Sequence, residues 1–455
     1  MASFRDLYKQ FRRQIRKLGR EDTLRVIWGY SLFLQIEGFN FPNDVEAGKQ
    51  FIESEYPPAI VGEWELELLT KEVLIHGQKT IEGAATFRQW STMARTLKLL
   101  RDFENQLAKK YHSPENFQIE ILRIANRQFR WQSNRPNAAG LMRFYLVFGD
   151  PEINESCKRI TGLSVSDILL CGLALMGVFQ KVPNTKGIVE GELSKFLSES
   201  TIKRFLLLTS RGAEEISALL REQQHFDERF PYAYNCIREF PLIRFYETRE
   251  FVVCPIPTLL YWRATSGLYY DLRADPGFQK AFGSSFEAYV RKVAVRARTT
   301  SRYQVVGEFA YVPKKRRKRS ADLFLTDGEN TLFIECKAKR LTWASKEGLN
   351  DTSALQKDLG YLSQAIVQSY KTASDFQKGQ YGTHGAGLGK KFTRSLLPLK
   401  IGTWLAHGSQ ACWKRRFPGF WWRQTCREPF PQICPTPPWR AKIWKQWSSW
   451  LTGTE

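Results

Sequence analysis

The chain has 455 residues, of which 43% are hydrophobic and 25% are charged. This composition is ordinary for a globular protein and excludes a wholly disordered chain. Lys and Arg number 68 against 46 Asp and Glu, so the formal net charge is +22. A surplus of that size favours a polyanionic partner or an anionic membrane surface, and the length predicts two or three domains.

Several classes of protein are excluded by pattern. The longest apolar stretch, residues 168–179, is well short of the roughly 20 residues that a membrane-spanning helix needs, so it predicts a buried core helix and we expect no membrane partner. The N-terminus lacks the continuous apolar core of a secretory signal. No two of the eight cysteines have C-x-x-C spacing, which argues against a zinc ribbon and favours reduced thiols in a cytoplasmic protein.

The first 20 residues predict a basic amphipathic helix. They contain seven Lys or Arg and one acid, and apolar residues such as Leu7, Phe11, Ile15 and Leu18 recur at helical spacing. Such a helix could contact phosphates or a membrane, or serve as an organelle transit signal. We favour a surface helix docked on the next domain, because basic helix faces are usually only solvated.

The chain up to residue 235 is predicted to form a helical region of unassigned role. Segments such as 93–110 and 190–222 carry apolar residues at intervals of three and four, and no repeat of fixed period is present. Its histidines are isolated, and no motif in it indicates a reaction. An adaptor that binds a partner protein is an open hypothesis for residues 1–235.

The pattern changes to short strands near residue 240. Residues 240–246 and 250–255 predict two strands around a turn, and residues 258–272 predict a helix. We therefore place residues 236–380 in a second domain, and residues 284–298 predict a further helix within it.

A β-hairpin is predicted around the acidic turn Asp327-Gly328-Glu329-Asn330. Residues 331–339 alternate in the manner of a strand with an apolar back and a charged front. A hairpin that closes symmetrically about Gly328 and Glu329 places Thr326 opposite Thr331. By the same register, Phe324 lies opposite Phe333, and Asp322 lies opposite Glu335.

The predicted opposition of Asp322 and Glu335 requires a counter-charge. Directly opposed residues have Cβ atoms about 4.5–5.5 Å apart, and like charges so placed destabilise a sheet. Two such carboxylates need a shared proton or a cation, and Lys337 lies on the same face. Mg²⁺, with Mn²⁺ as a substitute, suits a site of two carboxylates, a backbone carbonyl and waters.

These residues resemble a known motif. Asp322, a twelve-residue gap and then Glu335-Cys336-Lys337 is similar to the active-site pattern of the PD-(D/E)XK nuclease superfamily, which has the restriction-endonuclease-like fold. The resemblance covers residues 280–376 and implies an α/β core with a mixed central sheet. It implies that Asp322, Glu335 and the Cys336 carbonyl bind Mg²⁺ and that Lys337 orients or activates the attacking water. Ser320-Ala321 stands where the motif name has a Pro before the Asp.

The family often carries a Glu on the helix before the hairpin. Glu287 could therefore complete the metal site and take part in catalysis. The alternative is that Ser284 and Glu287 form a capping box at the N-terminus of the predicted helix, and the sequence leaves both open. Glu308, on the strand predicted to precede the hairpin, is a weaker candidate of the same kind.

A helix is also predicted over residues 352–376. RecB-like members of the superfamily carry a Gln and a Tyr four residues apart on this helix, whereas Gln364 and Tyr370 are six apart here. Gln364 is a candidate catalytic residue on that resemblance. The alternative is that Gln364 belongs to a polar stripe that is simply the solvent-facing side of the helix. The stripe consists of Lys357, Tyr361, Gln364, Gln368 and Lys371.

A run of six cations immediately precedes the hairpin. It could be a nuclear-localisation signal, a solvated loop or a clamp for the phosphates of a nucleic acid. Its position next to Asp322 favours the clamp, which would give affinity without sequence readout. The run is Lys314-Lys315-Arg316-Arg317-Lys318-Arg319.

Residues 381–455 predict an irregular tail. After Gln380 there are 12 Lys or Arg and two acids, which contribute 12 − 2 = +10 to the net charge, and eight of the 14 Trp follow Leu397. Such residues could form a stacking platform for nucleic acid. The hypothesis we favour is an out-of-frame translation in place of the authentic C-terminus, which sequencing of the gene would test.

Taken together, the sequence predicts a magnesium-dependent nuclease that hydrolyses phosphodiester bonds. The residues do not decide between DNA and RNA; the resemblance favours DNA, in a role such as restriction, phage defence or mobile-element processing. The alternatives are a nuclease-like module that binds nucleic acid without cutting it, and an adaptor whose helical half binds a partner. An out-of-frame tail would favour the first alternative, because the fold needs further strands after the 352–376 helix.

Overall fold

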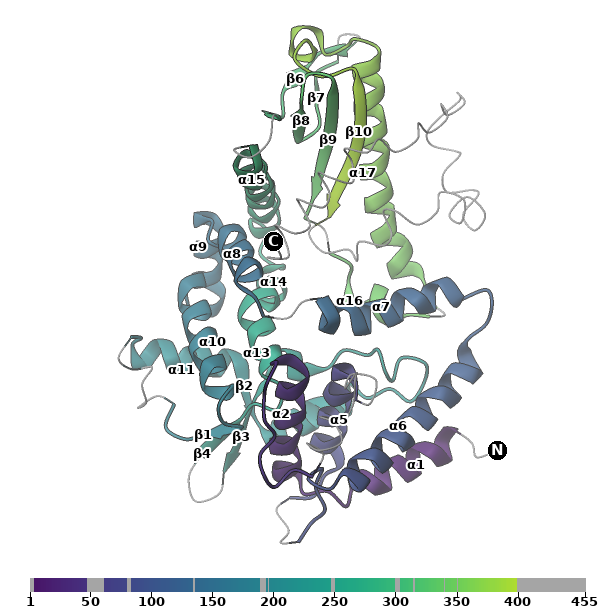
Figure 1. The fold of residues 1–455 in the computed structure, drawn as a ribbon, viewed down its shortest axis with the longest axis vertical. Helices are drawn as coiled ribbons and strands as arrows, with labels where there is room; N and C mark the ends of the chain where they lie inside the picture. The colour runs from purple at the N-terminus through teal and green to yellow at the C-terminus, as the bar shows by residue number, and fades with distance from the viewer. Residues whose placement is uncertain are drawn as a thin grey trace. The chain divides into compact units, whose positions relative to one another are not determined.

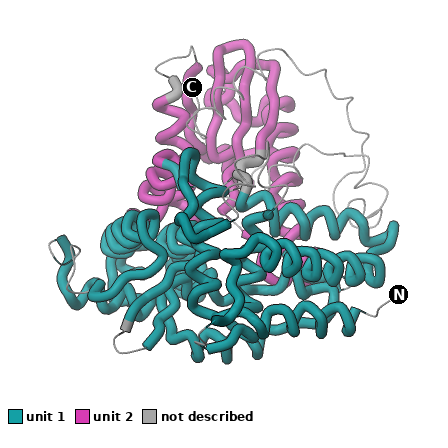
Figure 2. The backbone as a smooth tube through the Cα atoms, turned by 60° about the horizontal axis from the view of Figure 1, so that its bottom comes forward, with its two compact units in different colours: residues 1–137, 151–278, 346–351 teal, residues 138–150, 279–345, 352–455 magenta. Residues whose placement is uncertain are grey.

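The computed structural model describes residues 4–46, 61–79, 83–133, 136–188, 194, 196–246, 250–298, 303–313, 316–338, 340–349 and 351–398. The described chain divides into two compact units (Figure 2). Unit 1 comprises the residues up to Asn137, Pro151–Phe278 and Lys346–Asp351. Unit 2 comprises Ala138–Asp150, Gln279–Ser345 and the described residues from Thr352 onward.

Unit 1 is mainly helical, as the apolar spacing predicts (Figure 1). Its helices are α1 (Phe4–Ile15), α2 (Arg20–Gln35), α5 (Glu63–His76), α6 (Trp90–Tyr111), α7 (Phe117–Ser133), α9 (Pro151–Thr161), α10 (Val165–Phe179), α11 (Glu199–Thr209), α12 (Ala213–Glu222), α13 (Pro257–Trp262) and α14 (Leu268–Leu272), with the π-helical segment Arg263–Gly267 joining the last two.

A small mixed sheet lies within unit 1. Its strands, in the order β1-β4-β3-β2, are β1 (Asn184–Thr185), β4 (Glu250–Val253), β3 (Leu242–Tyr246) and β2 (Ser210–Gly212). β3 and β4 form the predicted antiparallel pair, but β3 also runs parallel to β2, and β4 pairs with β1. These pairings join residues 236–278 to unit 1, so the units divide after Phe278 rather than at the predicted boundary after residue 235.

The N-terminal helix α1 is docked on its neighbours, which is the interpretation that the sequence favoured. Phe11 and Ile15 are fully buried, and the rings of Tyr8 and Phe103 lie 5.3 Å apart between α1 and α6. The apolar stretch at 168–179 falls in α10, where Ile168 and Phe179 are buried as predicted. Within the described residues, no single helix is long and apolar enough to cross a membrane; α9 and α10 pass that test only as a pair bent by 70°.

Unit 2 is built on a four-stranded mixed sheet in the order β10-β9-β8-β5. β10 runs parallel to β9, and the other neighbouring pairs are antiparallel. The strands are β5 (Gln304–Gly307), β8 (Leu323–Thr326), β9 (Asn330–Lys337) and β10 (Lys391–Pro398), while β6 (Ala310–Tyr311) pairs separately with β7 (Lys318–Arg319). The helices are α8 (Ala138–Phe148), α15 (Phe278–Arg298) and α17 (Ser353–Gln377), and the short α16 (Trp343–Glu347) follows β9.

The β8–β9 hairpin has the predicted register. Thr326 lies opposite Thr331, and Phe324 opposite Phe333. The turn forms because Asp327 Oδ1 accepts hydrogen bonds from the backbone N–H groups of Glu329 and Asn330. Gly328 supplies the positive φ of 92° that other residues rarely adopt.

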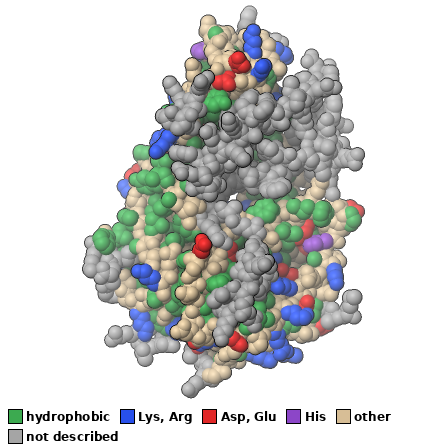
Figure 3. Space-filling view, viewed as in Figure 1, with side chains coloured by type: hydrophobic (Ala, Val, Ile, Leu, Met, Phe, Trp, Pro, Cys, Tyr) green, Lys and Arg blue, Asp and Glu red, His purple; other side chains and the backbone are tan. Residues whose placement is uncertain are grey.

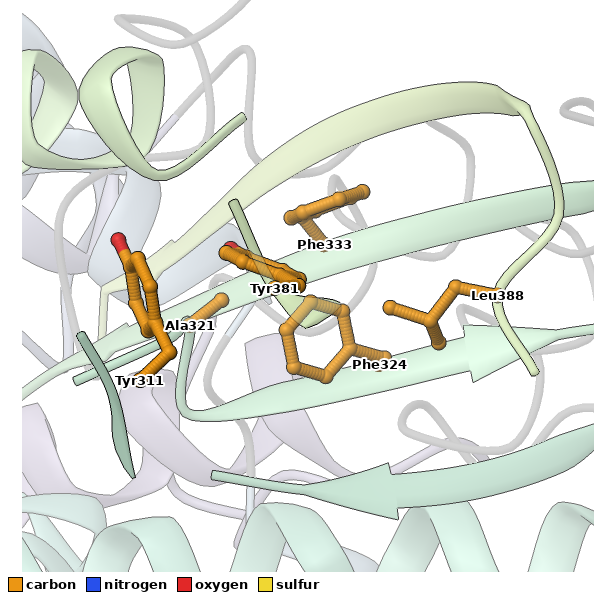
Figure 4. Close-up of a cluster of buried hydrophobic side chains, with 6 residues drawn as sticks. All are labelled: Tyr311, Ala321, Phe324, Phe333, Tyr381 and Leu388. Carbon is orange, nitrogen blue, oxygen red and sulfur yellow. The ribbon is translucent and has the colours of Figure 1, made fainter. Parts of the chain in front are cut away.

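The charged front predicted for β9 is charged only at its C-terminal end. On the same face, Phe333 and Phe324 are 1% and 0% exposed and belong to an aromatic core (Figure 4). α17 covers this face, with the rings of Phe333 and Phe376 5.4 Å apart. The alternation of residues 331–339 therefore predicts a strand. It does not show that the aromatic residues on the same face as the charges pack into the core. The core cluster consists of Tyr311, Ala321, Phe324, Phe333, Tyr381 and Leu388.

The prediction of an irregular tail from residue 381 is wrong for its first part. Tyr381 and Leu388 are buried in the core cluster, and β10 pairs with β9 from Lys391 to Pro398. These contacts join segments more than 50 residues apart, so no local pattern announces them. Unit 2 therefore has one strand after α17 within the described residues, while residues 399–455 and the frame-shift hypothesis lie outside them.

Gly389 is the point at which the chain returns to the sheet. Its N–H donates to Thr326 Oγ1 and its carbonyl accepts from Thr331 Oγ1. A β-carbon at Gly389 would collide with the backbone of Glu329 and Asn330.

We predict that Gly389→Ala destabilises unit 2 by about 1–3 kcal/mol, because the backbone must move to admit the methyl group. Gly387→Ala is the control, since nothing lies within 4 Å of a β-carbon there. The midpoint of chemical denaturation, followed by a probe in unit 2, measures both. Equal midpoints for the two variants would show that residues 381–398 are not packed as described.

Candidate active site

The candidate site lies at the end of the β8–β9 hairpin away from its turn. Asp322 immediately precedes β8, and Glu335, Cys336 and Lys337 are the last three residues of β9. The backbone N–H of Cys336 donates to Asp322 Oδ2 at 2.6 Å. This hydrogen bond holds the Asp322 carboxylate against β9. The paired register ends at Leu323 and Ile334, one pair short of the predicted opposition of Asp322 and Glu335, and the charge of Asp322 acts on Glu335 electrostatically.

The strand geometry of β9 indicates that the Cys336 carbonyl lies on the Asp322 side, as the Cys336 N–H does. The Asn330 carbonyl faces β8, because it accepts a hydrogen bond from the Asp327 N–H. The carbonyl of the preceding residue, Glu329, faces β10, because it accepts from the Lys391 N–H. Because peptide groups alternate along a strand, even-numbered residues of β9 turn both N–H and C=O toward β8. Cys336 follows this pattern, which is consistent with the role that the resemblance gives its carbonyl.

Glu335 is the most buried acid of the site, with 1% of its surface exposed. Its Oε1 accepts a hydrogen bond of 2.7 Å from Lys337 Nζ. Its Oε2 is also buried, and no residue in the described part of the chain donates a hydrogen bond to it. Leaving a buried carboxylate oxygen without a partner costs free energy, so this atom is where the site departs from ordinary packing.

The electrostatics of the hairpin end favour a bound cation. Burial raises the pKa of Glu335, and the charges of Asp322 and Glu308 add to the effect, while Lys337 opposes it. Burial likewise raises the pKa of Asp322, although the hydrogen bond from the Cys336 N–H acts in the opposite direction. Burial alone would lower the pKa of Lys337, but its bond to Glu335 reverses this and keeps the ammonium charged.

Glu287 belongs to the same group of charges. Desolvation raises the pKa of Glu287 to about 7, with further contributions from Asp322 and Glu308, although the side chain is exposed overall. The capping-box alternative is wrong, because α15 begins at Phe278 and Ser284 therefore lies inside the helix. A cap signal is local, and the sequence could not show that the helix starts six residues earlier.

Gln364 and Glu308 are the two remaining candidates that the sequence offers. Gln364 is exposed, as are all members of the α17 polar stripe, while Ala365 and Ser369 on the opposite side are buried. The stripe is thus the solvent-facing side of α17. Glu308, which the sequence ranks as a lesser candidate, follows β5 directly and interacts electrostatically with both Glu287 and Glu335.

The basic run is partly neutralised. Lys318 Nζ donates to Asp375 Oδ2 at 2.7 Å, and Arg319 Nη1 donates to Glu308 Oε2 at 2.9 Å. Arg316 and Arg317 are exposed, and no acid among the described residues pairs with them. Lys314 and Lys315 lie outside the described residues.

The residues of the site fit a hard divalent ion on chemical grounds. The carboxylates of Asp322 and Glu335, together with the Cys336 carbonyl, would form an all-oxygen donor set, which Mg²⁺ prefers. Glu335 Oε2 has no hydrogen-bond partner among the described residues and is available for such an ion. Within the described ranges, no three His, Cys, Asp or Glu side chains converge closely enough to hold a metal by themselves. Glu287 therefore adds negative charge, and the direct protein ligands would be Asp322, Glu335 and the Cys336 carbonyl.

Comparisons with protein-family models, curated proteins and solved structures give no match for this chain. Its chemistry has to be inferred from the residues of the site.

We predict that Mg²⁺ stabilises unit 2, because an ion that binds only the folded state at 100 times its Kd contributes about 2.7 kcal/mol. Thermal unfolding with Mg²⁺ and with EDTA measures the effect. Glu335→Gln should abolish the stabilisation by Mg²⁺. Glu329→Gln, which changes an exposed acid in the turn of the same hairpin, should leave it unchanged. An equal Mg²⁺ effect in both variants would contradict a site at Glu335.

The stabilisation by Mg²⁺ should also grow as the pH rises through about 7, where Glu287 loses its proton.

Proposed function

We propose that the chain is a metal-dependent nuclease that hydrolyses phosphodiester bonds, with DNA as its substrate. The observation that carries the proposal is the buried Glu335 carboxylate, which has one oxygen on Lys337 and the other without a hydrogen-bond partner among the described residues. A purely structural ion pair has no need of a second acid, yet Asp322 is held beside it by Cys336.

The order of the elements in unit 2 supports the same proposal. α15, β5, the β8–β9 hairpin, α17 and β10 follow one another in the arrangement that the resemblance implies, and the sheet is mixed. The motif residues fall at the end of the hairpin, on strands fixed by the aromatic core. A rigid hairpin suits catalysis because the charged groups need no rearrangement when the substrate binds.

Each residue has a distinct role in the proposed reaction. Asp322, Glu335 and the Cys336 carbonyl would hold Mg²⁺, which when bound polarises the phosphoryl oxygen and lowers the pKa of a water. Lys337 stays protonated and stabilises the negative charge that develops on the phosphate. Glu335 fixes the direction of the Lys337 ammonium through their hydrogen bond.

The charge of the chain supports a nucleic-acid substrate. The net charge is +22, and the exposed Arg316 and Arg317 lie in the same loop region that leads into Asp322. Cations without an acidic partner are free to neutralise phosphates, and binding through them should weaken as the salt concentration rises.

We predict that purified protein cleaves plasmid and oligonucleotide DNA with Mg²⁺ but not with EDTA. Asp322→Ala should fall to the metal-free background, and Lys337→Ala should lose about 100- to 1,000-fold in rate, the loss typical of removing one group that stabilises transition-state charge. Lys357→Ala, an exposed lysine on α17 in the same unit, should retain the full rate.

Two results would overturn the proposal. DNA binding without cleavage in the parent protein would favour the non-cleaving module. Cleavage that survives in Asp322→Ala would place the activity elsewhere or in a contaminant. RNA substrates in the same assay decide between the two nucleic acids.

A further inference from the structure

The exposed side of α1 carries a row of cations that belongs to no function described so far. Arg5, Lys9 and Arg13 on α1 are exposed, as is Arg16, which directly follows the last residue of the helix and continues its hydrogen-bond pattern by donating to the Arg12 carbonyl. At 3.6 residues per turn they fall within an arc of about 80° on the helix surface. We call these four residues the α1 basic row. Figure 3 shows Lys and Arg side chains gathered at the lower right of the view, where α1 lies.

The opposite side of α1 is fully used in packing. Phe11 and Ile15 are each 0% exposed, and Tyr8 is 6% exposed. The Tyr8 ring contacts the rings of Phe103 and Phe230, and its hydroxyl donates to Glu72 Oε2 at 3.2 Å. The helix is therefore fixed, and it presents its cations while its apolar side is buried.

The charge of the row is not compensated locally. Among the described acids, none forms an ion pair with Arg5, Arg13 or Arg16, and Lys9 lies 3.8 Å from Asp6. Three other exposed lysines of unit 1 are paired with acids of their own helices. Such pairs are Lys98–Asp102 at 2.6 Å, Lys158–Glu155 at 3.0 Å and Lys203–Glu199.

The positive field of this surface reaches its neighbours. Burial lowers the pKa of His76 to about 4, and the charges of Arg12, Arg16 and Arg221 act in the same direction. Arg221, on α12, is exposed and donates to the Ile75 carbonyl at 2.9 Å. Cations from two helices therefore converge here, and their mutual repulsion is a cost that an anionic partner would relieve.

We propose that the α1 basic row is a nucleic-acid-binding surface that holds the phosphate backbone of duplex DNA without reading its sequence. The choice of DNA as the polyanion rests on the proposed nuclease function. The row extends over 12 residues, a rise of about 16 Å at helical spacing. Phosphates of one strand follow each other every 3.4 Å along the duplex axis, so about four or five of them fit along this length.

The packing of α1 favours nucleic acid over a membrane surface. An amphipathic helix that binds a bilayer buries its apolar side among the lipids. The apolar side of α1 is already buried against α6 and its neighbours, so only charge is available for binding. Three of the four residues are Arg, whose guanidinium group binds phosphate oxygens in pairs.

The test is DNA binding by the full-length protein in EDTA, which separates binding from cleavage. A labelled short duplex is titrated over a series of salt concentrations. The variant Arg5→Gln/Arg13→Gln/Arg16→Gln should weaken binding equally for unrelated sequences and should reduce the slope of log K against log salt by about three. The control Lys98→Gln/Lys158→Gln/Lys203→Gln removes the same charge from paired lysines and should leave the slope unchanged.

The outcomes separate this inference from the proposed function. The α1 surface is refuted if the parent binds DNA and the α1 variant has the same slope of log K against log salt as the parent. It is also refuted if both triple variants reduce that slope equally. In either case the nuclease proposal stands. Loss of cleavage in the Asp322 variant with normal DNA binding leaves the α1 surface intact. If the α1 variant loses binding to phosphatidylserine vesicles but not to DNA, the surface is a membrane contact and the inference is wrong.

Discussion

The antiparallel pairing of β8 with β9 is the constraint on which the rest of the candidate site depends. It places Asp322 next to the Cys336 N–H and directs Glu335 and Lys337 to the same face. Phe324 and Phe333 lock the pairing, because they are buried opposite each other in the core cluster. A shift of one residue would move every side chain of β9 to the other face, so the same packing that stabilises unit 2 also assembles the acids.

Placing Asp322 and Glu335 close together costs free energy of folding. Glu335 is almost fully buried beside a second carboxylate, and a single lysine cannot satisfy both of its oxygens. Replacing such a group by an apolar one would often stabilise a protein. Groups with raised pKa values that cluster where charge is unsatisfied are typical of functional sites, and this supports the proposal of a catalytic site at the hairpin end.

The cations of the chain fall into two kinds. Lys318 and Arg319 have acidic partners in unit 2, and these bonds tie the basic run to α17 and to the segment after β5. The row on α1 has no such partners among the described residues apart from the loose contact of Lys9 with Asp6. Paired cations mainly position elements, whereas cations without an acidic partner remain available for the nucleic-acid contacts proposed above.

Part of this structure could be predicted from the sequence because its causes are local. The turn Asp327-Gly328-Glu329-Asn330 and the alternation that follows fixed the register of the hairpin, and with it the position of Asp322 beside β9. The periodicity of residues 352–376 similarly predicted α17, and its polar stripe is exposed as that periodicity implies.

Tertiary structure decided what depends on distant partners. The pairing of β10 with β9 brings a segment with little local signal into the sheet, and the burial of Tyr381 follows from the same return of the chain. The early start of α15 frees Glu287 from a capping role. Burial raises the pKa of Glu335, and the hydrogen bond to Glu335 raises the pKa of Lys337 against the effect of burial. Turns and periodicities are properties of neighbouring residues, whereas strand order and desolvation exist only once remote segments have packed together.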